Sequence, residues 1–416
     1  MNVLVWQWGR WGAGPRFAAE LAGGLRALPG VRVALSLSSA AELLRSDRPP
    51  ACELPVTTYG GWLGLGWRLA QLPFMLAALV RRVARLRPDL AICAMPAALD
   101  FVMAAALARL GVPFVVVAHD ADRHPGDGPP LQMALQRRLL RRAQALVALT
   151  EHVGRRLREQ RLVRGRLIVA AHPPLWFGPS STAPGSRADG RLRLLSFGRL
   201  LPYKGLDLLA EALLLLGPRA DLEVRVVGCG PESPPLQALR ALAFVRVENR
   251  WVPEGEVAGL LDWADALVLS HREASQSGVA SAAIAAGRWV VATRVGGLAE
   301  QLGREDLARL CDATPEALAL ALRRLLDGDV PGASPAAADP ALAWRSFAEQ
   351  LLRRLAPETE LAPAAAARNR RSAELASRSA SRMRSTEKPL AKSQIQQFST
   401  TKMIAPELDR PGPPSL

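Results

Sequence analysis

The stretch LLSFGRLLPYKGLDLLAEAL, residues 194–213, joins a short apolar run to a basic loop and then to a second apolar run with helical spacing. This pattern predicts a buried β-strand, a loop and an α-helix. Arg199 and Lys204 lie on the loop, and Lys204 is unusual because every other basic residue from Met1 to Glu387 is arginine. A fixed guanidinium fork and a compact, mobile ammonium at the end of a strand would suit a diphosphate.

The same rhythm of short apolar runs and helical patterns continues on both sides of this stretch. The predicted elements before it are strands at 2–8, 31–37, 89–95 and 113–119 and helices at 14–28 and 98–111. Further strands are predicted at 192–198, 223–230, 244–249, 265–270 and 289–295. Strands that alternate with helices indicate parallel sheets covered on both faces. We therefore expect two doubly wound α/β halves, with the ligand cleft beyond the carboxyl ends of their strands.

Breaks in this rhythm predict the domain boundaries. A Gly-, Ser- and Pro-rich segment at 178–190 is typical of a linker between an N-terminal domain, 1–177, and a C-terminal domain, 191–340. A terminal helix is expected at 341–357. The remainder, 358–416, is poor in aliphatic residues and rich in Ser and Arg, a composition that predicts a disordered basic tail.

Length and composition indicate a large intracellular protein. The 416 residues are 49% hydrophobic, enough to bury more than one core. The four cysteines (Cys52, Cys93, Cys229 and Cys311) lack metal-ligand spacing, which favours a reducing, cytoplasmic location. The N-terminal segment MNVLVWQWGR lacks a basic stretch followed by an apolar run, so no signal peptide is expected.

The formal charge of +15 is concentrated in the first half, where residues 1–176 hold 23 arginines and 11 acidic residues. Such a field could attract nucleic acid, anionic lipid or a phosphorylated substrate, and an arginine-rich solvated surface explains it equally well. No specific nucleic-acid binding is expected, because aromatic interleaving and a base-reading motif are absent from the sequence.

Residues 61–88 are largely apolar and end in the arginines Arg81, Arg82, Arg85 and Arg87. Arg68, Gln71 and Pro73 interrupt the run, so it is not expected to span a membrane. Two interpretations stay open: a buried crossover helix, or an interfacial helix that holds the protein on the inner face of the plasma membrane.

A second motif lies at 270–302, where a strand ends, the loop REASQSG follows and a helix of small residues begins. The backbone N–H groups of Ser277, Gly278 and Val279 would open that helix and form an anion site. The pair Gly296–Gly297 in the next loop either allows close approach of a ligand or forms an ordinary turn.

Five segments in order resemble successive blocks of the group 1 glycosyltransferase family. They are GRLLPYKG, VVGCGPE, VPEGEVAGLLDWADALVLS, EASQSGVASAAIAAGRWVVATRVGGLAE and LAWRSFAEQLLRRL, and they cover about residues 190–355. The N-terminal half matches more loosely, through GAGPRFAAEL, FVVVAHD and LVALTEHV. The resemblance implies the GT-B architecture, two Rossmann-like domains with an interdomain cleft, and transfer of a sugar with retention of anomeric configuration.

The resemblance also implies roles for individual residues. Arg199 and Lys204 would grip the diphosphate of a nucleotide-sugar donor and stabilise it as leaving group, and His119 would lie beside the donor sugar. The remaining implied donor contacts are Gly12, Gly14, Gly198, Ser277, Gly278 and Val279. No metal and no further cofactor are expected, because basic side chains and helix N-termini replace the ion.

One departure concerns the two glutamates, separated by seven residues, that family members commonly carry in this segment. Their positions fall at Ala274 and Ala282 here, and the loop is closer to a subset of the family that reads EATQSGV. Glu273 is expected to serve as the first glutamate with a one-residue shift. Glu300 is expected to contact the ribose in place of the second.

The sequence thus predicts a retaining, hexosyltransferase-type enzyme with a carbohydrate or lipid-linked acceptor, in bacterial surface polysaccharide or glycolipid assembly. The rival interpretation is a catalytically degenerate relative that acts as a scaffold or partner subunit, which Ala282 favours and which Arg199, Lys204 and His119 together oppose. The other histidines considered, His124, His152 and His172, are expected to be structural or solvated.

Overall fold

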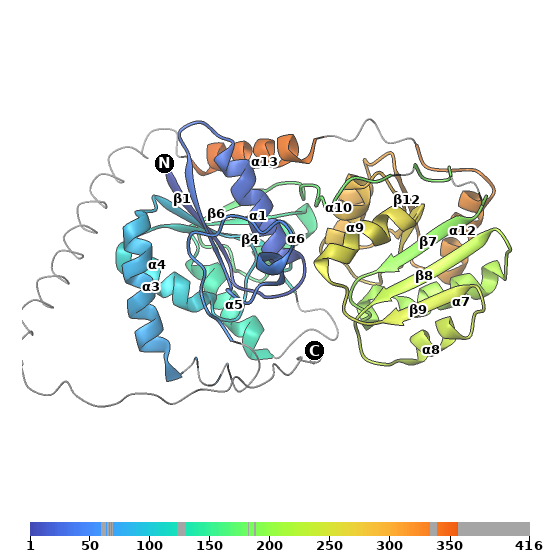
Figure 1. Cartoon of the computed structure of the whole chain (residues 1–416), viewed down its shortest axis with the longest axis horizontal. Coiled ribbons are helices and arrows are strands. Elements are labelled where there is room, and N and C mark those ends of the chain that lie inside the picture. Colours follow the sequence, from blue (N-terminus) through green and yellow to red (C-terminus); the bar gives the residue numbers. More distant parts are fainter. Residues whose placement is uncertain are drawn as a thin grey trace, which may run out of the picture.

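The computed structural model of the chain shows two α/β domains side by side (Figure 1). It describes residues 1–59, 70–122, 130–181, 183–186, 189–332 and 339–356, together with residues 64, 66 and 68. The predicted tail at 358–416 lies outside these ranges, as do residues 182, 187 and 188 of the predicted linker.

The N-terminal domain is built on a parallel sheet with the strand order β2-β1-β3-β4-β5-β6. Its strands are β1 (Asn2–Gln7), β2 (Arg32–Leu37), β3 (Leu90–Cys93), β4 (Phe114–Ala118), β5 (Ala145–Ala148) and β6 (Arg166–Val169). Its helices are α1 (Ala13–Arg26), η1 (Glu42–Arg45), α3 (Leu72–Leu86), α4 (Asp100–Leu110), α5 (Pro130–Arg142) and α6 (Glu151–Glu159). Side chains of β1 alternate between the two faces: Val3 and Val5 pack with α1, whereas Leu4 and Trp6 pack with α3 and α4.

The C-terminal domain has a second parallel sheet with the order β12-β11-β10-β7-β8-β9. Its strands are β7 (Leu192–Phe197), β8 (Leu222–Gly228), β9 (Val245–Asn249), β10 (Ala266–Leu269), β11 (Trp289–Thr293) and β12 (Ala308–Cys311). Its helices are η2 (Pro202–Lys204), α7 (Leu206–Leu216), α8 (Pro234–Arg240), α9 (Glu254–Trp263), α10 (Gly278–Ala285), α11 (Gly296–Leu302) and α12 (Pro315–Leu326). One face of the sheet packs against α7, α8 and α12, and the other against α9, α10 and α11.

The observed sheets confirm the predicted fold class of two doubly wound, Rossmann-like domains. In the second domain the chain starts at β7, runs outward to β9 and returns to β10 on the other side of β7. Ligands of open α/β sheets bind at such a reversal, beyond the carboxyl ends of the strands. The stretch that contains Arg199 and Lys204 leaves β7 at this point, and the loop REASQSG leaves its neighbour β10.

The last helix, α13 (Pro340–Leu355), follows the C-terminal domain but packs against α1 of the N-terminal domain (Figure 1). The Trp344 ring lies edge-on to Phe17, with centroids 4.9 Å apart, and its Nε1 donates a hydrogen bond to Pro174 O at 2.8 Å. The chain therefore crosses between the domains twice, and α13 completes the core of the first one.

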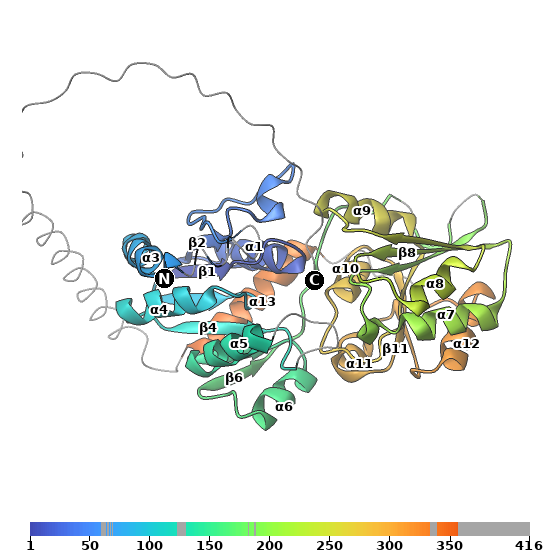
Figure 2. The same cartoon turned by 90° about the horizontal axis from the view of Figure 1, so that it is seen from below.

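Helix α3 corresponds to the described part of the apolar segment 61–88, whose Trp62 and Trp67 lie outside the described residues. It packs on α4 and buries Leu79 and Val83, whereas Phe74 is 80% exposed. The helix is thus amphipathic and lies at the surface, on the side of the N-terminal domain away from the C-terminal domain (Figures 1 and 2). No helix among the described residues is long and apolar enough to cross a membrane.

Candidate active site

A pocket of about 650 Å³ lies between the two domains, at the carboxyl ends of both sheets. Most of the residues predicted for the site line it. These are Gly12, Gly14, His119, Gly198, Arg199, Lys204, Ser277, Gly278 and Val279. Glu273 and Glu300 are not among its lining residues.

Arg199 and Lys204 are arranged around Tyr203, a buried residue that the sequence analysis did not identify. Arg199 Nη2 donates a hydrogen bond to the Tyr203 hydroxyl at 2.7 Å, and Lys204 Nζ lies 5.2 Å from the centroid of the same ring. Lys204 Nζ also donates to Nε2 of the buried His271, which follows β10, at 2.8 Å. The ring face and the imidazole hold the two cations at the pocket wall.

Two glycines occupy the start of α1, and each is required for a different structural reason. Gly12, the N-cap of α1, adopts φ +77°, a left-handed conformation that favours glycine. Gly14 has ordinary dihedrals, but a Cβ there would lie 2.7 Å from Nε2 of the buried Gln7 and 3.2 Å from Met95 Sδ. Gly12 thus provides the left-handed turn into α1, and Gly14, in the first turn of α1, leaves room for the Gln7 and Met95 side chains.

Helix α10 points its N-terminus at the pocket, and one of the three N–H groups predicted for the anion site already has an acceptor within the protein. Ser277 is the N-cap, and its Oγ accepts a hydrogen bond from Ala280 N at 3.2 Å. The Ser277 N–H, expected to face an anion, instead donates to Gln301 Oε1 of α11 at 2.8 Å. The N–H groups of Gly278 and Val279, in the first turn, have no acceptor within the helix, and both residues line the pocket.

His119 directly follows β4 and is buried at the pocket. Its Nε2 lies 2.9 Å from Ala94 O, and burial lowers its pKa to about 4. A carbonyl can only accept, so Nε2 carries the proton and the neutral ring turns its Nδ1 lone pair toward the other domain. There Gln276 Nε2, again unpredicted from the sequence, lies 3.5 Å away.

A second buried histidine, His172, packs edge-to-face against His119. His172 lies 6.0 Å from His119 between ring centroids, and burial lowers its pKa to about 3. Its Nδ1 is 2.9 Å from Ser281 Oγ on α10. The structural role expected for His172 fits this buried position. His152 is partly exposed beside Arg155, and His124 lies outside the described residues.

The two glutamates assigned to donor binding lie elsewhere. Glu300 Oε2 accepts a hydrogen bond from Glu151 N at 2.6 Å, at the N-terminus of α6, because a helix N-terminus attracts a carboxylate. Thr150 Oγ1 donates to Ser275 O at 2.9 Å beside it, so Glu300 belongs to the contact between the domains. Glu273 is exposed on the rim of the loop. Neither glutamate therefore lines the pocket: Glu300 lies at the contact between the domains, and Glu273 lies on the exposed part of the loop.

The carboxylates that do line the pocket include Glu42 and Glu254, which join the domains on one side of it. Glu254 forms an ion pair with Arg16, and its N–H donates to Glu42 Oε1 at 2.8 Å. Burial raises the pKa of Glu254, while Arg16 opposes the shift. Beside them, Trp11 and Trp251 meet edge-to-face with centroids 5.5 Å apart.

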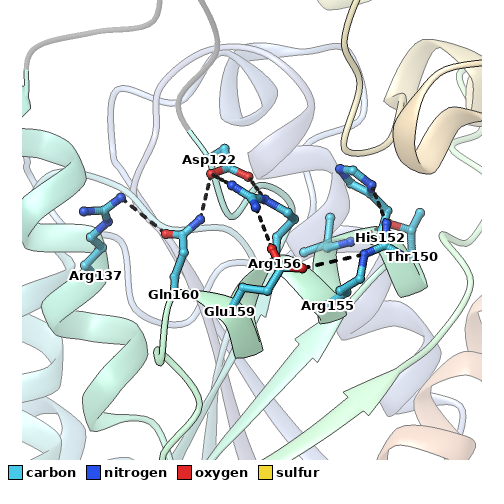
Figure 3. Close-up of polar contacts among 9 residues, drawn as sticks. Asp122, Arg137, Thr150, His152, Arg155, Arg156, Glu159 and Gln160 are labelled. Carbon is cyan, nitrogen blue, oxygen red and sulfur yellow. Dashed lines mark hydrogen bonds and ion pairs between the residues drawn. The ribbon is translucent and has the colours of Figure 1, made fainter.

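The far rim of the pocket is held by ion pairs on α6 (Figure 3). Arg156 spans both oxygens of Asp122, with Nε–Oδ2 at 2.7 Å and Nη2–Oδ1 at 3.0 Å. Gln160 Nε2 adds a hydrogen bond to Asp122 Oδ1 at 2.7 Å. These contacts fix the loop after β4, which carries Asp122 to the pocket lining. Within the part of the chain that the structure describes, no three His, Cys, Asp or Glu side chains gather as a metal site.

Two family models match the chain, one on each domain. Glycosyl transferases group 1 matches residues 191–328, and glycosyltransferase family 4 matches residues 14–173. Two curated relatives are named D-inositol 3-phosphate glycosyltransferase. The one from Corynebacterium glutamicum is 34% identical over 143 residues, and the one from Arthrobacter sp. is 36% identical over 141 residues. Each match covers 32% of this chain and 34% of the relative, so the chain spans about a third of the length of these relatives.

Solved structures extend the likeness to both domains. The Anabaena protein HepE in complex with UDP is similar with a TM-score of 0.60 and 18% identity, over 91% of this chain and 100% of that one. Sucrose-phosphate synthase from Thermosynechococcus elongatus gives a TM-score of 0.57 and 15% identity, over 92% and 98%. At these identities the likeness shows the shared fold, the GT-B architecture of two Rossmann-like domains.

Proposed function

Both domains of the chain match glycosyltransferase family models, group 1 at residues 191–328 and family 4 at residues 14–173, and on this basis we propose that the chain transfers a sugar from a nucleotide diphosphate sugar to a hydroxyl group of an acceptor. The observation that carries the proposal is one wall of the interdomain pocket. Arg199 and Lys204, both from the β7–α7 loop, and the N-terminus of α10 converge on this wall from two separate loops. Their positive potential suits the diphosphate of such a donor. HepE, whose fold is similar, was solved with UDP.

The proposed reaction breaks the bond between the anomeric carbon of the sugar and the distal phosphate oxygen. The departing diphosphate takes the electron pair, and Arg199, Lys204 and the α10 N-terminus stabilise its growing charge. The acceptor oxygen bonds to the anomeric carbon on the face that the diphosphate leaves, which retains the configuration. The acceptor proton passes to the leaving phosphate oxygen, so no protein base and no metal are required.

The N-terminal domain would present the acceptor, for which we propose a carbohydrate or lipid-linked molecule of bacterial surface polysaccharide or glycolipid assembly. The outer surface of this domain supports the lipid-linked alternative, because its composition suits contact with a lipid bilayer. There α3 exposes Phe74 together with Arg81, Arg82 and Arg85, the combination of an apolar residue and cations that binds anionic lipid surfaces. Peripheral attachment to a membrane is therefore part of the proposal.

A two-step assay tests the proposed function. Thermal shift with a panel of nucleotide sugars identifies the donor, because a tight ligand raises the melting temperature. Release of the nucleoside diphosphate is then followed with that donor and an acceptor extract. We expect turnover in the wild type, a rate lower by about 100- to 1,000-fold in Lys204→Ala, and wild-type rates in Gln237→Ala, a change on the exposed surface of α8. A wild type that binds a nucleotide sugar but never releases the diphosphate would support the scaffold interpretation instead.

A further inference from the structure

Gln301 of α11 binds the backbone at the start of α10. Its Oε1 accepts a hydrogen bond from Ser277 N at 2.8 Å, and its Nε2 donates to Ser277 O at 3.0 Å. Nε2 also donates to Ser281 Oγ, one turn further along α10, at 2.8 Å. A backbone N–H can only donate and a C=O can only accept, so the orientation of the amide is fixed. One side chain thus holds both backbone groups of the N-cap residue and a side chain of the same helix.

The bond to Ser277 O sets the direction of the next N–H group. The C=O of Ser277 and the N–H of Gly278 belong to one planar trans peptide, in which the two bonds point in opposite directions. Because Ser277 O is directed at Gln301, the Gly278 N–H points away from Gln301. Gly278 lines the pocket, whereas Gln301 is not among the lining residues. Gln301 therefore holds the first turn of α10 from outside the pocket.

Two features of α10 make an uncharged support at this place useful. The helix begins with Gly278, the residue type with the greatest conformational freedom, so its local sequence holds the first turn weakly. Its first turn contains no acidic residue, so the positive end of the helix is not neutralised by its own side chains. A carboxylate at position 301 would also accept from the Ser277 N–H, but it would cancel part of that positive potential. An amide fixes the backbone and leaves the potential intact.

We infer that Gln301 is a positioning residue: it orients the first turn of α10 so that the Gly278 and Val279 N–H groups meet the diphosphate of the donor. The inference rests on the proposed function. Arg199 and Lys204 bring positive charge to the pocket themselves, whereas Gln301 contributes geometry alone. Its removal should therefore weaken binding of the phosphates of a ligand and leave binding of the nucleoside part unchanged.

The test compares a nucleoside diphosphate with its nucleoside in Gln301→Met, which keeps the length of the side chain and removes both hydrogen-bonding groups. Calorimetry with UDP, GDP and ADP identifies the diphosphate that the wild type binds. Its affinity should fall about tenfold in Gln301→Met, because the N–H groups are no longer held in place. The affinity of the matching nucleoside, measured by ligand-observed NMR, should not change. Gln237→Met, a matched change on the exposed surface of α8, should leave both affinities as in the wild type.

Two further measurements separate the placement of α10 from its charge. Hydrogen exchange followed by mass spectrometry should be faster in peptides covering residues 274–285 of Gln301→Met, because the Ser277 N–H has lost its acceptor. Gln301→Glu retains an acceptor for that N–H and adds a negative charge beside the positive end of the helix. It should also weaken binding of the diphosphate and not of the nucleoside.

Equal losses of affinity for the diphosphate and the nucleoside would overturn the inference, because they indicate a general defect of the fold. Wild-type affinity for the diphosphate in both variants, or unchanged exchange in Gln301→Met, would overturn it as well. The wild type alone tests the proposed function. If it binds none of the three diphosphates, both the proposed function and the role of Gln301 are wrong. Losses confined to the diphosphate, in a protein without turnover, would support Gln301 and contradict the enzyme.

Discussion

Lys204 occupies a space whose shape explains why this arginine-rich chain uses lysine there. Its ammonium lies 5.2 Å from the centroid of the Tyr203 ring and donates to His271 Nε2 at 2.8 Å. His271 is 2% exposed, so its imidazole is enclosed by other groups of the protein. A guanidinium is planar and longer, and would have to displace either the ring or the imidazole. The space admits a compact cation.

Replacing Lys204 by arginine therefore tests geometry at constant charge. We expect Lys204→Ala and Lys204→Arg both to lower kcat by about 100- to 1,000-fold, the usual effect of removing one group that stabilises charge in the transition state. Affinity for the nucleoside diphosphate, measured by calorimetry, should fall much less. Arg240→Lys, a charge-preserving change on the exposed surface of α8, should leave turnover unchanged. Near-normal turnover in Lys204→Arg would mean that the lone lysine is an accident of composition.

The buried histidines give the stability of the protein a predictable pH dependence. Burial lowers the pKa of His172 to about 3, below the 6.5 of an unfolded histidine. Between these values the unfolded chain binds a proton that the folded chain does not, so the free energy of unfolding falls as pH drops below 6.5. At pH 5 this one residue should account for a loss on the order of 2 kcal/mol.

Denaturant titrations at pH 7 and pH 5 measure this difference for the wild type and for His172→Asn, which should lose less stability between the two conditions. Asp100 acts with the opposite sign, because burial raises its pKa to about 7 and its protonation stabilises the fold as pH falls. That contribution is common to both proteins and cancels in the comparison. An equal loss in wild type and variant would show that His172 is protonated in the folded state.

Two interpretations of α3 follow from its sequence: a buried crossover helix or an interfacial helix on a membrane. The structure excludes full burial, since α3 buries Leu79 and Val83 and exposes Phe74 together with its arginines. We expect the protein to sediment with anionic vesicles and not with neutral ones. Each cation contributes about 1 kcal/mol near an anionic surface. Arg81→Glu with Arg85→Glu should therefore weaken binding more than about tenfold.

The matched control for α3 is a double charge reversal on α12, Arg323→Glu with Arg324→Glu, which changes the net charge equally on the other domain. It should retain vesicle binding, because attraction falls off within a Debye length of the lipid surface. If both double variants weaken binding to the same extent, net charge is responsible and α3 has no special role. Equal sedimentation with neutral vesicles would remove the electrostatic explanation altogether.

Which elements could be predicted from the sequence follows from the strength of their local patterns. β1, β4 and β7 are apolar runs followed by distinct loops, and the predicted strands overlap them. β5, β6 and β12 were not predicted, because none of them stands out from the arginine-rich helical patterns beside it. β3 and β10 are equally short, but they lie within the longer apolar stretches DLAICAM and DALVLS. Pairing in the sheet, rather than their own sequence, decides the conformation of β5, β6 and β12.

The residues of the site differ in the same way: some could be predicted from local sequence, and others could not. Arg199, Lys204 and the α10 N-terminus could be predicted, since each lies in a strand-to-helix loop whose character is local. His119 and Gln276 meet across the domains from positions 157 residues apart, and no local pattern records that meeting. The hydrogen bond of the Ser277 N–H could not be predicted for the same reason, because its acceptor comes from another helix. Contacts between the domains have to be seen in three dimensions.

Helix α13 links the two domains, because it follows the C-terminal domain in sequence and completes the core of the N-terminal one. Its backbone approaches α1 closely at Gly24, where a Cβ would lie 2.4 Å from Trp344 O. The neighbouring Gly23 is exposed on the same helix, and a Cβ there would meet no atom within 4 Å. The two glycines therefore form a natural pair for testing whether the packing of α13 holds the molecule together.

Gly24→Ala should push α13 away from α1 and destabilise the protein by about 1–3 kcal/mol, the usual penalty for overpacking. Gly23→Ala should stabilise it by about 0.5–1 kcal/mol, because alanine favours the helix and meets no neighbour. Denaturant titration measures both changes in the free energy of unfolding, and hydrogen exchange followed by mass spectrometry shows which helices are affected. Exchange of the α13 amides should accelerate in Gly24→Ala alone. If α13 remains protected in Gly24→Ala and the two variants have equal stability, the close contact between Gly24 and Trp344 does not exist in solution.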